Sequence, residues 1–289
     1  MVETDDAVPT PVAWQPITPT GIAAFANAPL RRLLTVQAVI GLFLMAAFIT
    51  YFARTWVPVI SEVTQLLPET SIIRDGQLHW PPDTPPILVE NSFFSLAVAR
   101  QQARPAGQTA DFKIELSRDE LKMTSLLGYW SFTYPRWAEI PLTRAELEPK
   151  WGAWLPALLA GISGLITFGI WLSWCGLAAV YSWPLRVMVY FRDRQTSRLG
   201  CWKLSSAALL PGALLMGMAT LLYALEQIPL VGVIVAFGIH LVMGPVYAFL
   251  SAFALPLLPE AATLKGNPFS DSDKKKSSTQ GRKNPFRRR

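Results

Sequence analysis

Few residues in this chain of 289 residues have the types and spacing that metal binding or catalysis requires. Asp75, His79 and Asp83 follow one another at intervals of four and offer oxygen and nitrogen atoms of the kind used by metal ions and acid–base catalysts. A structural interpretation accounts for them better, because Asp75 and Gly76 form a hairpin-type dipeptide and Asp83 lies in a proline-rich loop. The sequence also lacks phosphate-loop, zincin, hydrolase-elbow and Cys-x-x-Cys motifs. We therefore expect a non-enzymatic protein that uses no metal ion and no cofactor.

A second polar candidate is His240, the one ionisable residue well inside a long apolar run. An ionisable residue within a membrane span is a functional-site hypothesis by default. The alternative is that a neutral imidazole bonds to a neighbouring helix, for example at Ser173, Ser205 or Thr220, and fixes the packing. Because no acidic residue lies in any apolar run to serve as a proton partner, we favour the packing role.

Basic residues that could contact anionic lipids form two groups. The first, in residues 184–203, contains Arg186, Arg192, Arg194 and Arg198. The second, in the C-terminal tail, contains Lys274, Lys275, Lys276, Arg287, Arg288 and Arg289. Near an anionic leaflet each basic residue contributes about 1 kcal/mol, less at high salt. Residues 184–203 fit an interfacial helix and a solvated loop equally well. The tail has few interleaved aromatic residues, so we expect no specific binding of nucleic acid.

Four apolar runs surround these residues. Residues 151–183 contain no Asp, Glu, Lys, Arg or His, and roughly 20 apolar residues suffice to cross the hydrocarbon core of a bilayer. Similar runs cover residues 31–53, 204–225 and 230–255, and we predict a transmembrane helix for each of the four. The first run is too long and too far from the N-terminus for a typical signal peptide, so we interpret it as an anchor. Pro211 is expected to interrupt the third helix, and Pro245 the fourth.

Residues 54–150 differ from the apolar runs and predict a mainly β extracytoplasmic domain inserted into a helical membrane protein. Phe112, Ile114 and Leu116 alternate with charged residues, which is the period of a strand with one buried face. This segment contains no cysteine, so its stability must come from an apolar core. We expect that core to contain Phe93, Leu96, Val98, Phe112, Ile114 and Leu116. A Thr-x-x-Glu pattern at residues 143–146 predicts the start of a short helix that leads toward residue 151.

The terminal segments and the flanking charges predict the orientation. Residues 1–30 are rich in proline and residues 260–289 are polar and basic, so we predict a disordered N-terminal arm and a disordered tail. Basic residues lie at the start of the first run, as Arg31 and Arg32, after the second run and in the tail, whereas residues 226–229 contain none. By the positive-inside rule both termini are cytoplasmic, and residues 54–150 are outside the cytoplasm. The lack of an Asn-x-Ser/Thr site in that domain favours a bacterial inner membrane.

The layout of one anchor, a β-rich outer domain and a C-terminal group of three spans resembles a family of uncharacterised bacterial inner-membrane proteins, some labelled maltodextrin-utilisation-like. The resemblance includes the stretch Ile-Arg-Asp-Gly-Gln-Leu at residues 73–78 and covers residues 33–255 in outline. It implies a bacterial inner-membrane location and brings no catalytic residue.

We therefore expect an outer domain that binds or organises a protein or other partner in the cell envelope, with the basic tail at the anionic cytoplasmic leaflet. The alternative is a small-solute transporter, or an accessory subunit of one, that uses the two proline-interrupted helices.

Overall fold

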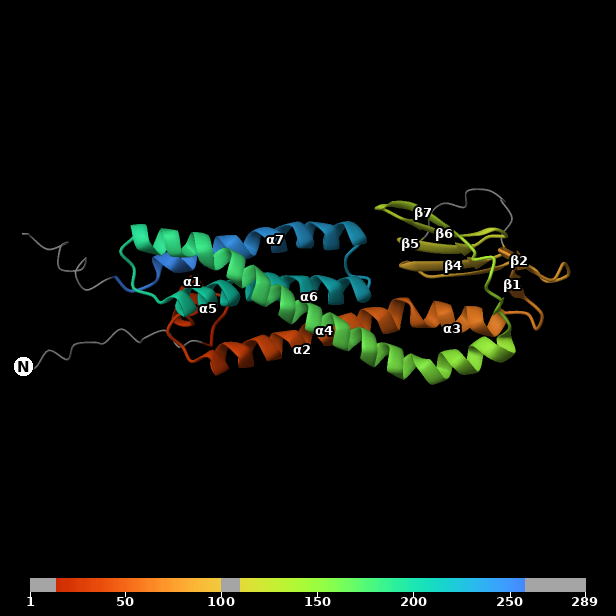
Figure 1. Ribbon diagram of the computed structural model, residues 1–289, viewed down its shortest axis with the longest axis horizontal. Coiled ribbons are helices and arrows are strands. Elements are labelled where there is room, and N and C mark those ends of the chain that lie inside the picture. Colours follow the sequence, from red (N-terminus) through yellow and green to blue (C-terminus); the bar gives the residue numbers. More distant parts are fainter. Residues whose placement is uncertain (1–13, 100–109, 258–289) are drawn as a thin grey trace, which may run out of the picture. The chain divides into compact units, whose positions relative to one another are not determined.

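The computed structural model describes residues 14–99 and 110–257 of the chain (Figure 1). They divide into two compact units. The first, which we call the basic unit, takes the residues up to Leu33, then Leu177–Ala208, then the residues from Pro245 onward. The second, which we call the sheet unit, takes Leu34–Gly176 and Leu209–Gly244.

Helices of ten or more residues make up most of the described chain (Figure 1). They are α2 (Leu30–Thr55), α3 (Val57–Leu66), α4 (Arg144–Phe191), α5 (Arg198–Ala208), α6 (Leu210–Ala224) and α7 (Leu230–Phe253). Within residues 14–99 and 110–257, four helical stretches could cross a membrane by length and composition: Leu30–Leu66, Arg144–Phe191, Arg198–Ala224 and Leu230–Phe253. The prediction of four long apolar helices is confirmed, and these helices indicate a membrane protein.

The helix α4 is longer than the sequence predicted. Its 48 residues would measure about 72 Å at 1.5 Å per residue, against about 30 Å for the hydrocarbon core of a bilayer. The predicted short helix, the span 151–183 and the start of the basic segment 184–203 are therefore one element. Pro184 lies inside α4. A proline removes only one backbone hydrogen bond of a helix. In an apolar environment the other backbone groups have no partners outside the helix, so the helix continues through the proline.

The two expected helix interruptions have different outcomes. A break separates α5 from α6 at Leu209, and Pro211 occupies the first turn of α6, where its missing N–H costs nothing. In contrast, Pro245 lies inside α7, which continues without interruption from Leu230 to Phe253. The expected interruption of the fourth helix is therefore not seen.

The N-terminal arm also differs from the prediction. Pro19–Ala24 form a short helix, α1, and the Gly21 N–H donates a 3.1 Å hydrogen bond to the Thr18 hydroxyl. A threonine cap followed by a proline is a helix-start signal, and the high proline content of this segment concealed it. Ile22 and Phe25 are fully buried, and α1 packs against α5 within the basic unit. Residues 1–13 and 258–289 lie outside the described residues.

Two sheets lie in the sheet unit, which confirms a mainly β region between the first two long apolar stretches. The smaller has the order β2-β1-β8, with β1 (Ile72–Arg74), β2 (Gln77–His79) and β8 (Ile140–Pro141). The larger has the order β3-β4-β5-β6-β7, with β3 (Ile87–Glu90), β4 (Phe94–Val98), β5 (Phe112–Leu116), β6 (Glu120–Ser125) and β7 (Gly128–Thr133). Among the described strands only β4 and β5 pair in parallel, and the other neighbours are antiparallel.

The predicted hairpin turn joins β1 to β2. Asp75 and Gly76 have φ angles of 54° and 77°, the left-handed conformation that both central residues of the preferred two-residue hairpin turn adopt. Asp75 is thus explained by backbone geometry, as the sequence indicated.

The larger sheet has one apolar and one polar face. Side chains alternate along a strand, and the pairing register places twelve apolar residues on one face. They are Ile87, Val89, Phe94, Leu96, Val98, Phe112, Ile114, Leu116, Leu121, Met123, Trp130 and Phe132. The opposite face carries the ion pairs Lys113–Glu115 and Lys122–Glu120, at 3.2 and 3.4 Å. The alternating pattern therefore predicted the two faces correctly.

The core of the sheet unit lies where α3 packs on β3 and β4. Phe93 and Val98 are buried there as expected, whereas Leu96, Phe112, Ile114 and Leu116 are only partly buried. The half of the apolar face formed by β6 and β7 is more open: Trp130 is 45% exposed and Phe132 is 54% exposed.

Candidate functional site

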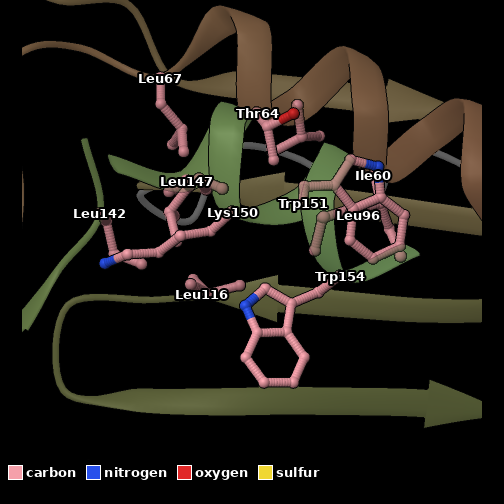
Figure 2. Close-up of a pocket in the computed structure, with 12 residues that line it drawn as sticks. Ile60, Thr64, Leu67, Leu96, Leu116, Leu142, Leu147, Lys150, Trp151 and Trp154 are labelled. Carbon is pink, nitrogen blue, oxygen red and sulfur yellow. The ribbon is translucent and has the colours of Figure 1, made fainter. Parts of the chain in front are cut away.

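An apolar groove opens in the sheet unit between α3, the apolar sheet face and the first turns of α4 (Figure 2). Its volume is about 380 Å³, within the usual range for pockets that hold small molecules. The lining residues are Ile60, Val63, Thr64, Leu67, Leu96, Val98, Leu116, Leu142, Leu147, Lys150, Trp151 and Trp154. We call this set the apolar groove.

The walls of the groove are formed by one face of α3, one face of the start of α4 and the apolar face of strands β4 and β5. On α3 and just after it, Ile60, Val63 and Leu67 recur at the spacing of one helix face. Leu147 and Trp154 recur in the same way on α4. Across the groove, Val98 of β4 pairs directly with Leu116 of β5, so their side chains share the apolar face. Figure 2 shows the α3 side chains on one side of the groove, and Leu116 with the Trp154 ring on the other.

A side-chain hydrogen bond holds the two helical walls together. The indole Nε1–H of Trp151 donates to the Ser61 hydroxyl at 2.9 Å, so α3 and α4 are joined next to the groove. The Trp154 side chain is 68% exposed and leaves the groove open on that side. The groove thus has a fixed base and an accessible mouth.

The Thr64 hydroxyl and the Lys150 ammonium of the groove lining already have partners. The Thr64 hydroxyl donates to the Ser61 carbonyl oxygen at 2.8 Å. The Lys150 ammonium lies 2.6 Å from the Glu146 carboxylate, and both side chains are about half exposed. The lining therefore presents no nucleophile or general base and mainly hydrocarbon surface. Burying a CH₂ group against such a surface is worth about 0.8 kcal/mol.

His240 lies on the part of α7 that belongs to the sheet unit, close to α6. A Cβ atom at Gly212 would be 2.8 Å from the His240 Nδ1 atom and 3.2 Å from its carbonyl oxygen. Within the described residues the buried Nδ1 atom has no hydrogen-bond partner. The hydroxyls of Ser173 and Thr220 donate instead to carbonyl oxygens of their own helices. The hydrogen bond to a neighbouring helix that the packing interpretation expected is not seen at Nδ1, and the packing role of His240 stays a prediction.

Asp75, His79 and Asp83, which the sequence attributed to structure rather than to metal binding or catalysis, are not brought together as a ligand cluster. Asp75 lies in the β1–β2 turn, His79 ends β2, and Asp83 follows in the next loop. Across residues 14–99 and 110–257, no group of three or more His, Cys, Asp or Glu residues is placed to hold a metal ion.

The predicted lipid-contacting arginines meet in the basic unit. Arg186, Arg194 and Arg198 line a hollow of about 450 Å³ between the end of α4 and the start of α5. Its other lining residues are Val189, Tyr190, Phe191, Asp193, Thr196, Ser197 and Cys201. We call this set the basic hollow. The guanidinium carbon of Arg192 instead lies 4.9 Å from the centre of the Phe253 ring. Lys274, Lys275, Lys276, Arg287, Arg288 and Arg289 lie outside the described residues.

The segment 184–203 is neither a separate interfacial helix nor one loop. Its first part completes α4, residues 192–197 turn the chain, and its last part begins α5. Both sequence interpretations treated it as a single piece, whereas the turn between two helices brings three of its four arginines, Arg186, Arg194 and Arg198, around one hollow.

The apolar groove was not predicted from the sequence. The available signal was the pair of apolar stripes before and after the β region, in residues 57–67 and 147–154. Each stripe alone is typical of any amphipathic helix, so their meeting on one sheet could not be inferred.

Comparisons with protein-family models, with curated proteins and with solved structures find no match to this chain.

Proposed function

We propose that this chain is a non-enzymatic, membrane-anchored binding module whose sheet unit holds the hydrocarbon chain of a lipid or lipid-like envelope molecule. The observation that carries the proposal is the open apolar groove, whose two helical walls are extensions of candidate membrane spans.

The location of the groove favours a lipid over a water-soluble ligand. Its α3 wall belongs to the 37-residue stretch Leu30–Leu66, and its α4 wall belongs to the 48-residue stretch Arg144–Phe191. Roughly 20 residues suffice to cross the hydrocarbon core, so both stretches extend beyond it. Trp151 and Trp154 are of the type that gathers at the membrane–water interface. A lipid chain at that interface can reach the groove without crossing bulk water.

We propose further that the sheet unit faces the periplasm of a bacterium and that both termini are cytoplasmic. Two observations support this orientation. The basic unit contains the arginines that flank the spans: Arg31, Arg32, Arg186, Arg192, Arg194 and Arg198. The short loop between α6 and α7, which has no basic residue, belongs to the sheet unit. The basic unit and the C-terminal tail then contact the anionic cytoplasmic leaflet.

The alternative of solute transport has less support. It depended on interruptions in two apolar helices, and α7 is continuous through Pro245.

The proposal is tested by filling the groove. Leu116→Trp adds an indole to the groove wall, while Leu88→Trp makes the same change on the polar face of the sheet, at a residue that is 41% exposed. Lipids retained by the full chain in mild detergent are measured by native mass spectrometry. We expect Leu116→Trp to lower the amount of retained lipid by about tenfold, because the lipid chain then buries one or two fewer CH₂ groups in the groove. We expect Leu88→Trp to leave the amount of retained lipid unchanged. Equal retention by both variants would contradict the proposal.

A further inference from the structure

We propose that the basic hollow binds a phosphate group, carried either by an anionic phospholipid headgroup or by a soluble phosphoester. This inference concerns the basic unit and does not depend on the apolar groove.

The charge of the hollow favours an anion. Arg186, Arg194 and Arg198 line it, and Asp193 is the one acidic residue among its lining residues in the described chain. In residues 14–99 and 110–257 the ion pairs involve other residues, so none of these three arginines is neutralised by a carboxylate there. The hollow therefore keeps an excess of positive charge.

Arg194 is held in place on one side only. Its Nη1 group donates a hydrogen bond to the Leu255 carbonyl oxygen, and the neighbouring Gln195 N–H donates to the Pro256 carbonyl oxygen at 2.8 Å. The Nε atom of Arg194 is buried and has no partner among the described residues. The Arg194 guanidinium is thus anchored through Nη1, and its Nε–H remains available to donate to an oxygen atom of a ligand.

The start of α5 adds to the attraction. This helix has 11 residues, and the N–H of Gly200 in its first turn donates to the Ser197 hydroxyl at 2.9 Å. The N-terminus of a helix carries a partial positive charge and favours phosphate. Thr196 and Ser197 also line the hollow and can donate hydroxyl hydrogens.

A phosphate group matches these donors better than a carboxylate. Guanidinium groups pair with phosphate through two parallel N–H···O bonds, and the oxygens of a phosphate can accept from several directions at once. Tyr190 and Phe191 give the hollow an apolar border, which suits the glycerol and acyl part of a phospholipid.

The test uses the full chain in neutral detergent and two probes, dihexanoyl phosphatidic acid and glycerol 3-phosphate, measured by isothermal titration. The variant combines Arg186→Gln with Arg198→Gln. Both residues are exposed, so we expect the double variant to fold. The matched control is Arg192→Gln, which also removes charge from this segment but lies outside the hollow lining. We expect the double variant to lose about tenfold in affinity, because charge-assisted bonds to phosphate are removed, and the control to lose less than about twofold.

The two probes distinguish the sources of the phosphate. Binding of phosphatidic acid alone supports a lipid headgroup, and binding of glycerol 3-phosphate with similar affinity supports a soluble phosphoester. The proposal is overturned if the double variant binds both probes as the wild type does, or if Arg192→Gln weakens binding equally.

Discussion

The hydroxyl of Tyr223, near the end of α6, donates a 2.6 Å hydrogen bond to Oδ2 of Asp111, which directly precedes β5. The Tyr223 ring also meets Phe93 edge-on at 4.8 Å and stacks on Tyr51 of α2 at 5.7 Å. A residue of a predicted membrane helix is therefore part of the core that supports the sheet. This hydrogen bond joins the α6–α7 end of the sheet unit to its β domain, and it supports the proposed topology, in which both lie on the same side of the membrane.

The Tyr223–Asp111 hydrogen bond predicts that removal of the Tyr223 hydroxyl destabilises the protein. Tyr223 is 6% exposed, and a bond to a charged group contributes about 1.5–3 kcal/mol. Tyr223→Phe should therefore lower the free energy of unfolding by roughly that amount, measured by thermal unfolding in detergent. Tyr129→Phe, at an exposed site on β7, is the control and should have no effect. An unchanged melting temperature in Tyr223→Phe would show that the bond contributes nothing.

The orientation predicts which surfaces a membrane-impermeant maleimide reaches in intact cells. In a chain whose two cysteines are replaced by alanine, Leu127→Cys in the sheet unit should be labelled without permeabilisation. Leu127 is 85% exposed at the β6–β7 turn, so access to it is not limited by burial. Gln195→Cys in the basic unit should be labelled only after permeabilisation. The reverse pattern would invert the proposed topology.

The two faces of the sheet predict opposite effects of one added charge. Ile114 lies on the apolar face, where aspartate has no partner, so Ile114→Asp should lower the free energy of unfolding by roughly 2–5 kcal/mol. Thr124 lies on the polar face directly opposite Lys113, so Thr124→Asp gains an opposite charge and should be neutral. Urea unfolding of the full chain in detergent measures both. Equal losses in stability would refute the face assignment.

The close approach of α6 and α7 predicts that Gly212 matters more than His240. Gly212→Val would place methyl groups against the His240 ring and carbonyl oxygen, and should lower the melting temperature. His240→Leu should leave insertion and lipid retention intact if the imidazole only fills space. Complementation of a deletion strain provides the functional readout. Loss of complementation by well-expressed His240→Leu would instead support the transport alternative.

The sequence predicted those features that local pattern determines. A charge-free run such as residues 151–183 has one structural solution, and Asp75-Gly76 specifies a turn whose φ angles only a few residue types tolerate. Helix ends were predicted less well, because Pro184 and Pro245 resemble helix breakers and yet lie inside α4 and α7.

The features missed depend on residues that are far apart in the chain. The parallel pairing of β4 with β5 leaves no local signature. Tyr223 resembled one more residue of an apolar run, and its burial against Phe93 depends on how α6 meets the sheet. The groove brings together Ile60, Leu116 and Leu147. They are too far apart in the chain for a helical or strand repeat in the sequence to connect them.

Photo-crosslinking shows whether a hydrocarbon chain occupies the apolar groove. A phospholipid with a diazirine at the end of one acyl chain is incorporated with the full chain into nanodiscs, and the labelled peptides are identified by mass spectrometry. We expect crosslinks at groove residues on the sheet, such as Leu96 and Leu116, and we expect these crosslinks to be lost in Leu116→Trp but not in Leu88→Trp. Crosslinks at Leu165 and Phe168, exposed on α4, should appear in every sample as an internal control. If crosslinks occur at these α4 residues and never on the sheet, the groove does not hold a lipid chain.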